Sequence, residues 1–239
     1  MAVSRFIVGG LLCVTLVSLA GCNGANPKDP AIEPRPFQVR DLAKSDVDLV
    51  AETHLRLTLG HLRTLMEKLY RRNPREWRKG GQPGIEAAVE RVFGAARPVR
   101  FPELQGRRSV GSMRLAFEED FQGDRVLALV EGLRGMVLDA YNGQQEFYLL
   151  DELDPQRLYN AARNIEIAVW KLSNDRDAGG RLFFVTNEVA GPIRNLSFER
   201  LFGKIIALQD SMAQIVADTT NRRIKNVIQS AASAVFIGI

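Results

Sequence analysis

Two histidines and two groups of acids are the side chains of this sequence whose types suit catalysis or metal binding. His54 and His61 are its only histidines, and on a helix their seven-residue spacing corresponds to about 10.5 Å. One metal ion cannot bind both rings at that separation, since chelating pairs stand at i and i+4. We interpret both as core or interface histidines held by hydrogen bonds. The alternative is a general base, although no serine or cysteine nucleophile motif accompanies either residue.

The acids form one group at Glu118-Glu119-Asp120 and another at Asp151-Glu152. Two carboxylates held a few ångströms apart across a cleft can hydrolyse a glycosidic bond. We expect these five acids to lie on a solvated face of the fold. Glycoside hydrolysis by a pair drawn from them is the alternative.

The run Asp175-Arg176-Asp177-Ala178-Gly179-Gly180 shares its first acids with a calcium-binding loop. An EF-hand loop needs an oxygen ligand at its fifth position and a glutamate at its twelfth. This sequence has Gly179 and Thr186 at those positions. We predict a helix-ending turn here, with a cation site as the alternative, and we predict no metal ion and no cofactor for the chain.

Basic residues are concentrated in one part of the chain. Residues 71–114 contain eleven Lys or Arg against four Glu, whereas residues 115–155 contain ten Asp or Glu against two Arg. Guanidinium groups beside an aromatic ring suit phosphate or carboxylate groups, including anionic lipid headgroups. The predicted anion-binding cluster consists of Arg71, Arg72, Arg75, Trp77, Arg78 and Lys79. The alternative is that the basic and acidic stretches neutralise each other or are solvated.

Apolar residues recur at helical spacing through most of the chain, which predicts a mainly α-helical bundle with long antiparallel helices. The predicted helices cover residues 45–72, 85–93, 109–121, 126–140, 155–173 and 197–219, the last with an extension toward residue 231 as an alternative. Residues 181–186 are the one strand-like run, and we expect an extended connection or a minor β element there.

Helix caps can be assigned from the residue types. Ser45 followed by Asp48 predicts a capping box for the first long helix. Asn73 before Pro74 predicts the cap of a short helix, and Asp154 before Pro155 predicts the cap of a longer one. With 46% apolar and 25% charged residues, the chain has the composition of an ordinary globular protein.

The N-terminus has the pattern of an export signal. Arg5 precedes an apolar segment over residues 6–19, which is too short to span a membrane, since that takes about 20 helical residues. The segment ends in Leu19-Ala20-Gly21-Cys22, which resembles the lipobox of bacterial lipoproteins. The resemblance implies that the Cys22 thiol is acylated and that the signal over residues 1–21 is removed.

The same resemblance implies a location. Asn23 stands where an Asp often retains such lipoproteins in the inner membrane, so we expect the periplasmic face of the outer membrane. Residues 22–36 contain four prolines and read as the acylated cysteine plus an extended tether. Residues 37–239 are the single helical domain. Removal of the signal discards Cys13 and leaves Cys22 to carry lipid, so no disulfide is expected.

The expected partners are the membrane, through lipidated Cys22, and an envelope protein. Nucleic acid is excluded for an exported chain, despite the pI near 9.3. The leading hypothesis is that the chain is a non-enzymatic structural or interaction lipoprotein. Its mature domain resembles the uncharacterised helical envelope lipoproteins of Gram-negative bacteria. The alternatives are a carrier of a lipid or another apolar ligand, and a cell-wall hydrolase that uses the five acids. The apolar end, residues 234–239, is expected to pack into the core, or otherwise against a partner or the membrane.

Overall fold

The fold was analysed in a computed structural model, which describes residues 36–94, 100–149, 151–188, 195–221 and 235–238. The chain divides into two units, Met1–Val39 and Arg40–Ile239. The predicted signal, Cys22 and nearly all of the predicted tether lie outside the described residues.

The described part of the chain is mainly α-helical, which confirms the predicted fold class. No strand is present among the described residues, where β pairing is limited to two isolated bridges, Arg176 with Leu182 and Glu188 with Asn195. The helical elements are η1 (Val39–Ala43), α1 (Asp46–Arg72), α2 (Pro74–Lys79), α3 (Ile85–Phe93), η2 (Pro102–Leu104), α4 (Ser109–Leu115), α5 (Arg125–Ala140), α6 (Pro155–Asn174) and α7 (Ser197–Thr220).

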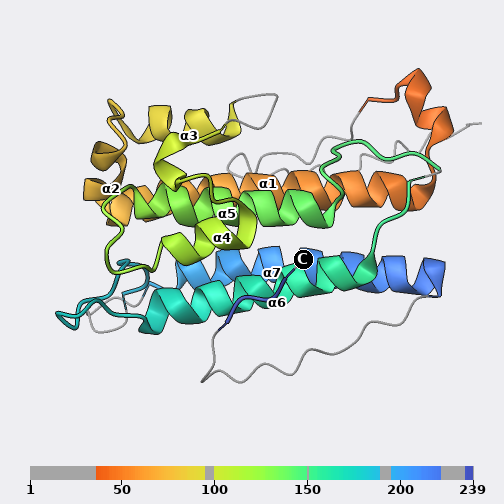
Figure 1. Cartoon of the computed structure of the whole chain (residues 1–239). Helices are drawn as coiled ribbons and strands as arrows, with labels where there is room; N and C mark the ends of the chain where they lie inside the picture. Colours follow the sequence, from red (N-terminus) through yellow and green to blue (C-terminus); the bar gives the residue numbers. More distant parts are fainter. Residues whose placement is uncertain (1–35, 95–99, 150, 189–194, 222–234, 239) are drawn as a thin grey trace, which may run out of the picture. The chain divides into compact units, whose positions relative to one another are not determined.

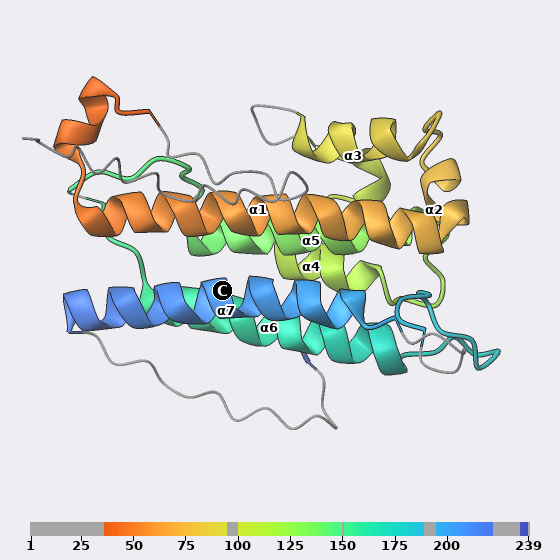
Figure 2. The same cartoon turned by 180° about the vertical axis from the view of Figure 1, so that it is seen from behind.

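Four long helices, α1, α5, α6 and α7, form an antiparallel bundle (Figures 1 and 2). Helix α1 packs against α5 and α7, and α6 packs against the same two helices. The sequence colours show that each helix runs opposite to both of its neighbours (Figure 1). None of the helices in the described residues is long and apolar enough to cross a membrane.

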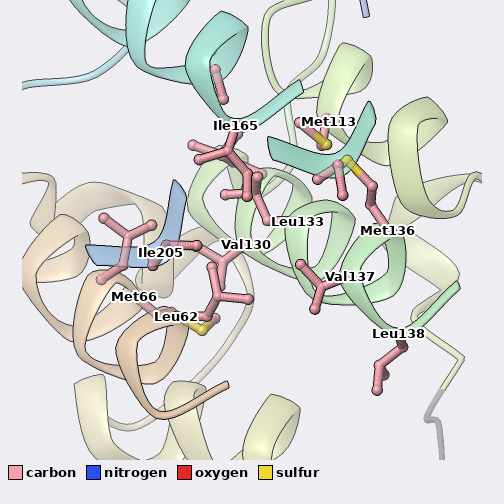
Figure 3. Close-up of a cluster of buried hydrophobic side chains, with 14 of the residues drawn as sticks. Leu62, Met66, Met113, Val130, Leu133, Met136, Val137, Leu138, Ile165 and Ile205 are labelled. Atoms are coloured by element: carbon pink, nitrogen blue, oxygen red, sulfur yellow. The ribbon is translucent and has the colours of Figure 1, made fainter. Parts of the chain in front are cut away.

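Side chains from all four helices fill the centre of the bundle (Figure 3). Leu62 and Met66 of α1 meet Val130 and Val137 of α5, and all four are fully buried. The other two helices contribute Ile165 and Ile205 to the same cluster. Burial of such side chains, at about 25 cal/mol per Å² of apolar surface, is the main force that holds the helices together.

Two of the predicted caps are confirmed. The Asp48 amide donates to Ser45 Oγ at 3.2 Å and the Ser45 amide donates to Asp48 Oδ2 at 2.7 Å, so the capping box starts α1. The Gln156 amide donates to Asp154 Oδ1 at 2.9 Å at the start of α6. Each cap satisfies amide groups that the first helical turn cannot pair internally.

Asn73 is the N-cap residue of the short helix that starts at Pro74, as predicted, but its side chain has another use. Asn73 makes no side-chain cap bond with α2. Its amide nitrogen donates to the Val185 carbonyl at 3.0 Å, and the Val185 amide donates to Asn73 Oδ1 at 2.8 Å. The backbone of the extended segment that we expected near residues 181–186 therefore forms hydrogen bonds with the Asn73 side chain, which follows the end of α1.

The predicted helix over residues 109–121 is wrong beyond Leu115, where α4 ends. The cause is the buried guanidinium of Arg125. It donates at 2.8 Å to the carbonyls of Ala116 and Glu118 through Nη1, and to the carbonyl of Phe121 through Nη2. A charged group with several strong donors thus replaces helical hydrogen bonds, and the chain turns back into α5.

A buried polar junction lies next to Arg125 at the start of α5. Asp124 caps the helix by accepting from the Leu127 amide at 3.0 Å, and it also accepts from the Tyr70 hydroxyl at 2.7 Å. Glu76 accepts from the Arg125 amide at 2.8 Å. Burial raises the pKa of Asp124 to about 6, although its hydrogen bonds act in the opposite direction.

Helix α4 lies directly on α5 because α5 has glycine at the contact. A Cβ atom at Gly132 would lie 2.7 Å from the Met113 amide nitrogen and 2.8 Å from the Ser109 carbonyl oxygen. One turn away, a Cβ at Gly135 would lie 3.1 Å from Ser109 Oγ. Ser112 Oγ also donates to the Ala128 carbonyl at 2.7 Å. The two backbones therefore approach at a distance that only glycine permits.

The described part of the apolar C-terminal segment packs on the domain, as predicted. Phe236 is 3% exposed and joins the hydrophobic core. The Ile237 amide donates to Asn164 Oδ1 at 2.6 Å, and Asn164 Nδ2 donates to the Ile237 carbonyl at 2.9 Å. Arg114 donates to the Phe236 carbonyl at 3.1 Å. The possible extension of the last helix lies outside the described residues.

The glycine contact gives a testable prediction for stability. The change Gly132→Ala places a methyl group against backbone atoms of α4 and should destabilise the fold by about 1–3 kcal/mol. Gly60→Ala is the matched control, because Gly60 lies in the middle of α1 with no atom near a Cβ. It should stabilise the chain by about 0.5–1 kcal/mol. Urea denaturation measures both, and a Gly132→Ala variant as stable as the parent would contradict the packing.

The buried carboxyl of Asp124 gives a second prediction, for pH dependence. Its pKa rises from 3.8 to about 6 on folding, so the folded chain binds this proton more tightly than the unfolded chain. Stability should therefore fall as pH rises from about 4 to about 6, by on the order of 3 kcal/mol. Asp124→Asn should flatten this part of the stability profile, whereas Asp218→Asn, at an exposed site on α7, should not. Two superimposable profiles for Asp124→Asn and the parent would count against the burial of this charge.

Candidate anion-binding cleft

The predicted anion-binding cluster surrounds the C-terminal end of α1 and the whole of α2. Most of its cations already have acidic partners: Arg71 with Glu67 at 3.9 Å, Arg72 with Glu188 at 3.5 Å and Lys79 with Glu76 at 2.8 Å. Arg78 lies 4.8 Å from the centre of the Trp77 ring, and Trp77 packs against the core. Arg75 is exposed and has no side-chain partner among the described residues. Anion binding by this cluster remains a prediction.

The two groups of acids do not converge. Glu118, Glu119 and Asp120 precede α5, whereas Asp151 and Glu152 follow it, and a helix of 16 residues is about 24 Å long. Glu119 accepts from the Ala178 amide at 3.1 Å, and Asp151 accepts from the Tyr148 amide at 2.9 Å. These carboxylates hold loops, and their placement lends no support to the hydrolase hypothesis.

His54 lies between α1 and α7, as expected of an interface histidine. Its Nδ1 is 2.9 Å from the Val50 carbonyl oxygen, and its Nε2 is 3.2 Å from Ser211 Oγ. Burial lowers the pKa of His61, and Lys204 lowers it further. The His54 ring thus belongs to the packing of α1 with α7, whereas the His61 ring makes no hydrogen bond within the described residues.

The segment after α6 forms a turn, as predicted. Asp177 accepts from the Arg181 amide at 2.9 Å and pairs with the Arg181 guanidinium at the same distance. The Gly180 amide donates to the Asp177 carbonyl at 2.8 Å. Nowhere in the described ranges do three Asp, Glu, His or Cys side chains gather closely enough to hold a metal ion.

The structure brings a different set of arginines together. A cleft of about 660 Å³ lies between the segment around η2, the start of α4 and the outer face of α5. Its charged lining consists of Arg100, Arg107, Arg108, Arg134, Glu131 and Asp139. Its apolar lining includes Phe101, Leu104 and Leu138, which are largely buried. We call this the arginine cleft, and its volume is in the usual range for small-ligand sites.

The loop that carries the cleft's exposed arginines is fixed from both sides. Arg91 of α3 pairs with Glu103 at 2.5 Å and lies 5.0 Å from the centre of the Phe101 ring. At the other end, Ser109 donates its hydroxyl hydrogen to the Asp139 carboxylate. Ser109 has a φ of 47°, which costs a residue with a side chain conformational energy and is maintained by this packing.

The four arginines of the cleft differ in their partners. Arg134 is 7% exposed and lies 3.2 Å from Glu131, one turn earlier on α5. Arg107 pairs with Glu118. The guanidinium groups of Arg100 and Arg108 make no hydrogen bond or ion pair within the described residues. Both groups therefore keep all of their donors for a ligand.

Glu131 is an acid of the cleft lining that lies beside Arg134. Burial raises its pKa, whereas Arg134 and Arg108 lower it by favouring the charged form. Asp139 accepts a hydrogen bond from the neutral Ser109 hydroxyl and keeps its negative charge. The lining therefore carries four guanidinium groups against two carboxylates, and the guanidinium groups of Arg100 and Arg108 make no hydrogen bond or ion pair within the described residues.

Sequence reasoning did not single out these residues. Arg100, Arg107 and Arg108 were counted within the basic stretch, but no tryptophan stands beside them to draw attention. Arg134 interrupts the apolar segment of α5, and that interruption, three residues after Glu131, was the available signal.

Comparisons with known proteins yield no relative. No protein-family model matches the chain, and no curated protein or solved structure matches it either. The kind of ligand that the arginine cleft could bind is therefore inferred from the residues that line it. A cleft lined by guanidinium groups and apolar side chains suits a ligand that carries an oxyanion and an apolar portion.

Proposed function

We propose that this chain is a bacterial lipoprotein, anchored at the periplasmic face of the outer membrane through acylated Cys22, and that its helical domain is a structural or interaction module of the cell envelope. The observation that carries the proposal is Leu19-Ala20-Gly21-Cys22 directly after a short apolar segment. Acyl chains on a cysteine would hold a folded domain at a bilayer, provided that more than one chain is attached.

The properties of the folded domain support a role in binding. The bundle has a filled apolar core, so it can stand as an independent unit on a tether. Its longest helices, α1 and α7, have 27 and 24 residues and present long polar faces. Such faces are suited to contacts with an envelope protein, which we propose as its partner.

A second candidate function is the carriage of an apolar ligand with an anionic headgroup. The arginine cleft favours it, since the cleft combines two guanidinium groups that have no partner among the described residues with largely buried apolar side chains. The centre of the bundle is occupied by side chains such as Leu62 and Ile165 (Figure 3). A ligand would consequently lie at the arginine cleft and not along the bundle axis.

The anchor can be tested by metabolic labelling with palmitate in cells. The parent chain should incorporate label, and Cys22→Ala should lose essentially all of it, because the acylated sulfur is gone. Cys13→Ala is the matched control and should keep its label, since Cys13 would be discarded with the signal. Outer-membrane fractions should contain the labelled parent. Label that persists in Cys22→Ala would refute the anchor.

A further inference from the structure

Two guanidinium groups that make no hydrogen bond or ion pair within the described residues line one cleft, and such an arrangement suits an anion. Arg100 lies just before η2, and Arg108 lies at the N-cap of α4. We propose that the arginine cleft binds a phosphate-type oxyanion attached to an apolar group, with Arg100 and Arg108 as its direct ligands. The inference rests on the second candidate function and assigns its headgroup site to these residues, away from the cluster around Trp77.

A phosphate group fits the donors better than a single carboxylate does. Each guanidinium presents a planar fork that pairs with two oxygens of one anion. A phosphate has enough oxygens to accept from two such forks at once, and its charge of about −1.5 to −2 suits two cations. Arg134 adds a further positive charge to the lining, although its Nη1 already donates to Glu131.

The apolar lining of the cleft indicates that the ligand has an apolar portion. Phe101, Leu104 and Leu138 line the cleft beside the arginines. These side chains are 3–9% exposed, so an acyl or aromatic group would cover a small remaining apolar surface, at about 25 cal/mol per Å² removed from water. The combination therefore fits a lipid headgroup with the start of its chains, or a soluble phosphate ester with an apolar group.

Glu131 limits the affinity of the cleft for anions. Its carboxylate lies beside Arg134 and interacts with Arg108, so it competes for the positive charge that would hold a phosphate. Replacement by glutamine removes the negative charge and keeps the shape of the side chain. Glu131→Gln should therefore bind an anionic ligand more tightly than the parent, an outcome that a purely structural Glu131 would not produce.

The test uses the native chain, purified in nonionic detergent, with its arginine side-chain N–H signals followed by NMR. Three probes are added in turn: inorganic phosphate, phosphatidic acid in the micelles, and zwitterionic phosphatidylcholine in the micelles. The Arg100 and Arg108 signals should shift with phosphatidic acid and not with phosphatidylcholine. Arg108→Gln should weaken binding about tenfold or more, as expected for the loss of a charge-assisted pair.

The matched control is Arg56→Gln. Arg56 is an exposed arginine of α1 outside the cleft, so its loss changes the net charge equally and should leave the affinity unchanged. Shifts with both inorganic phosphate and phosphatidic acid support the site and the carrier function. Shifts with inorganic phosphate alone support the site and refute the carrier. Absence of shifts with either anion, or equal weakening in Arg56→Gln and Arg108→Gln, overturns the proposal. The result is independent of the anchor, since the cleft lies within residues 100–143.

Discussion

The close approach of α4 to α5 at Gly132 is the constraint on which the candidate site depends. Backbone atoms of Ser109 and Met113 occupy the space where a side chain at Gly132 would stand. This contact brings the N-terminal end of α4, with Arg108, over the face of α5 that carries Glu131 and Arg134. Two segments that are more than twenty residues apart in the sequence thereby share one cleft. A wider helix separation would move the charges of α4 away from those of α5.

The structure uses its charged side chains in two different ways. Arg125 donates hydrogen bonds to backbone carbonyls of the loop before α5, so it stabilises a turn and has few donors available for a ligand. Asp124 and Glu76 are likewise committed to helix starts. At the arginine cleft, by contrast, Arg100 and Arg108 keep their donors within the described residues. The difference separates charges that hold the fold from charges that can hold a ligand.

The helices could be predicted from sequence because their apolar faces and caps are local patterns. Ser45 and Asp154 bond to amides two or three residues away, so residue type and spacing suffice. The end of α4 could not be predicted, since the carbonyls after Leu115 accept hydrogen bonds from the Arg125 guanidinium, which only the folded structure brings close to them. The side-chain partner of Asn73 could not be predicted for the same reason, because Val185 is distant in the sequence.

The candidate site was harder to predict than the fold. Clustering along the chain pointed to the arginines around Trp77, where the structure instead shows ion pairs with Glu67, Glu76 and Glu188. The cleft collects its arginines from three separate segments, and only the packing of α4 on α5 reveals their proximity. Composition showed that residues 71–114 are basic, but the tertiary structure determines which of these cations have acidic partners.

The central claim is that Arg100 and Arg108 hold one oxyanion together, and a crystal structure of the native chain grown with phenyl phosphate tests it most directly. The probe carries a phosphate and an aromatic ring, so it matches both parts of the cleft. We predict phosphate density within hydrogen-bond distance of both guanidinium groups, with the ring against Phe101 and Leu138. An empty cleft in crystals grown at saturating phenyl phosphate, or phosphate bound only around Trp77, would contradict the claim.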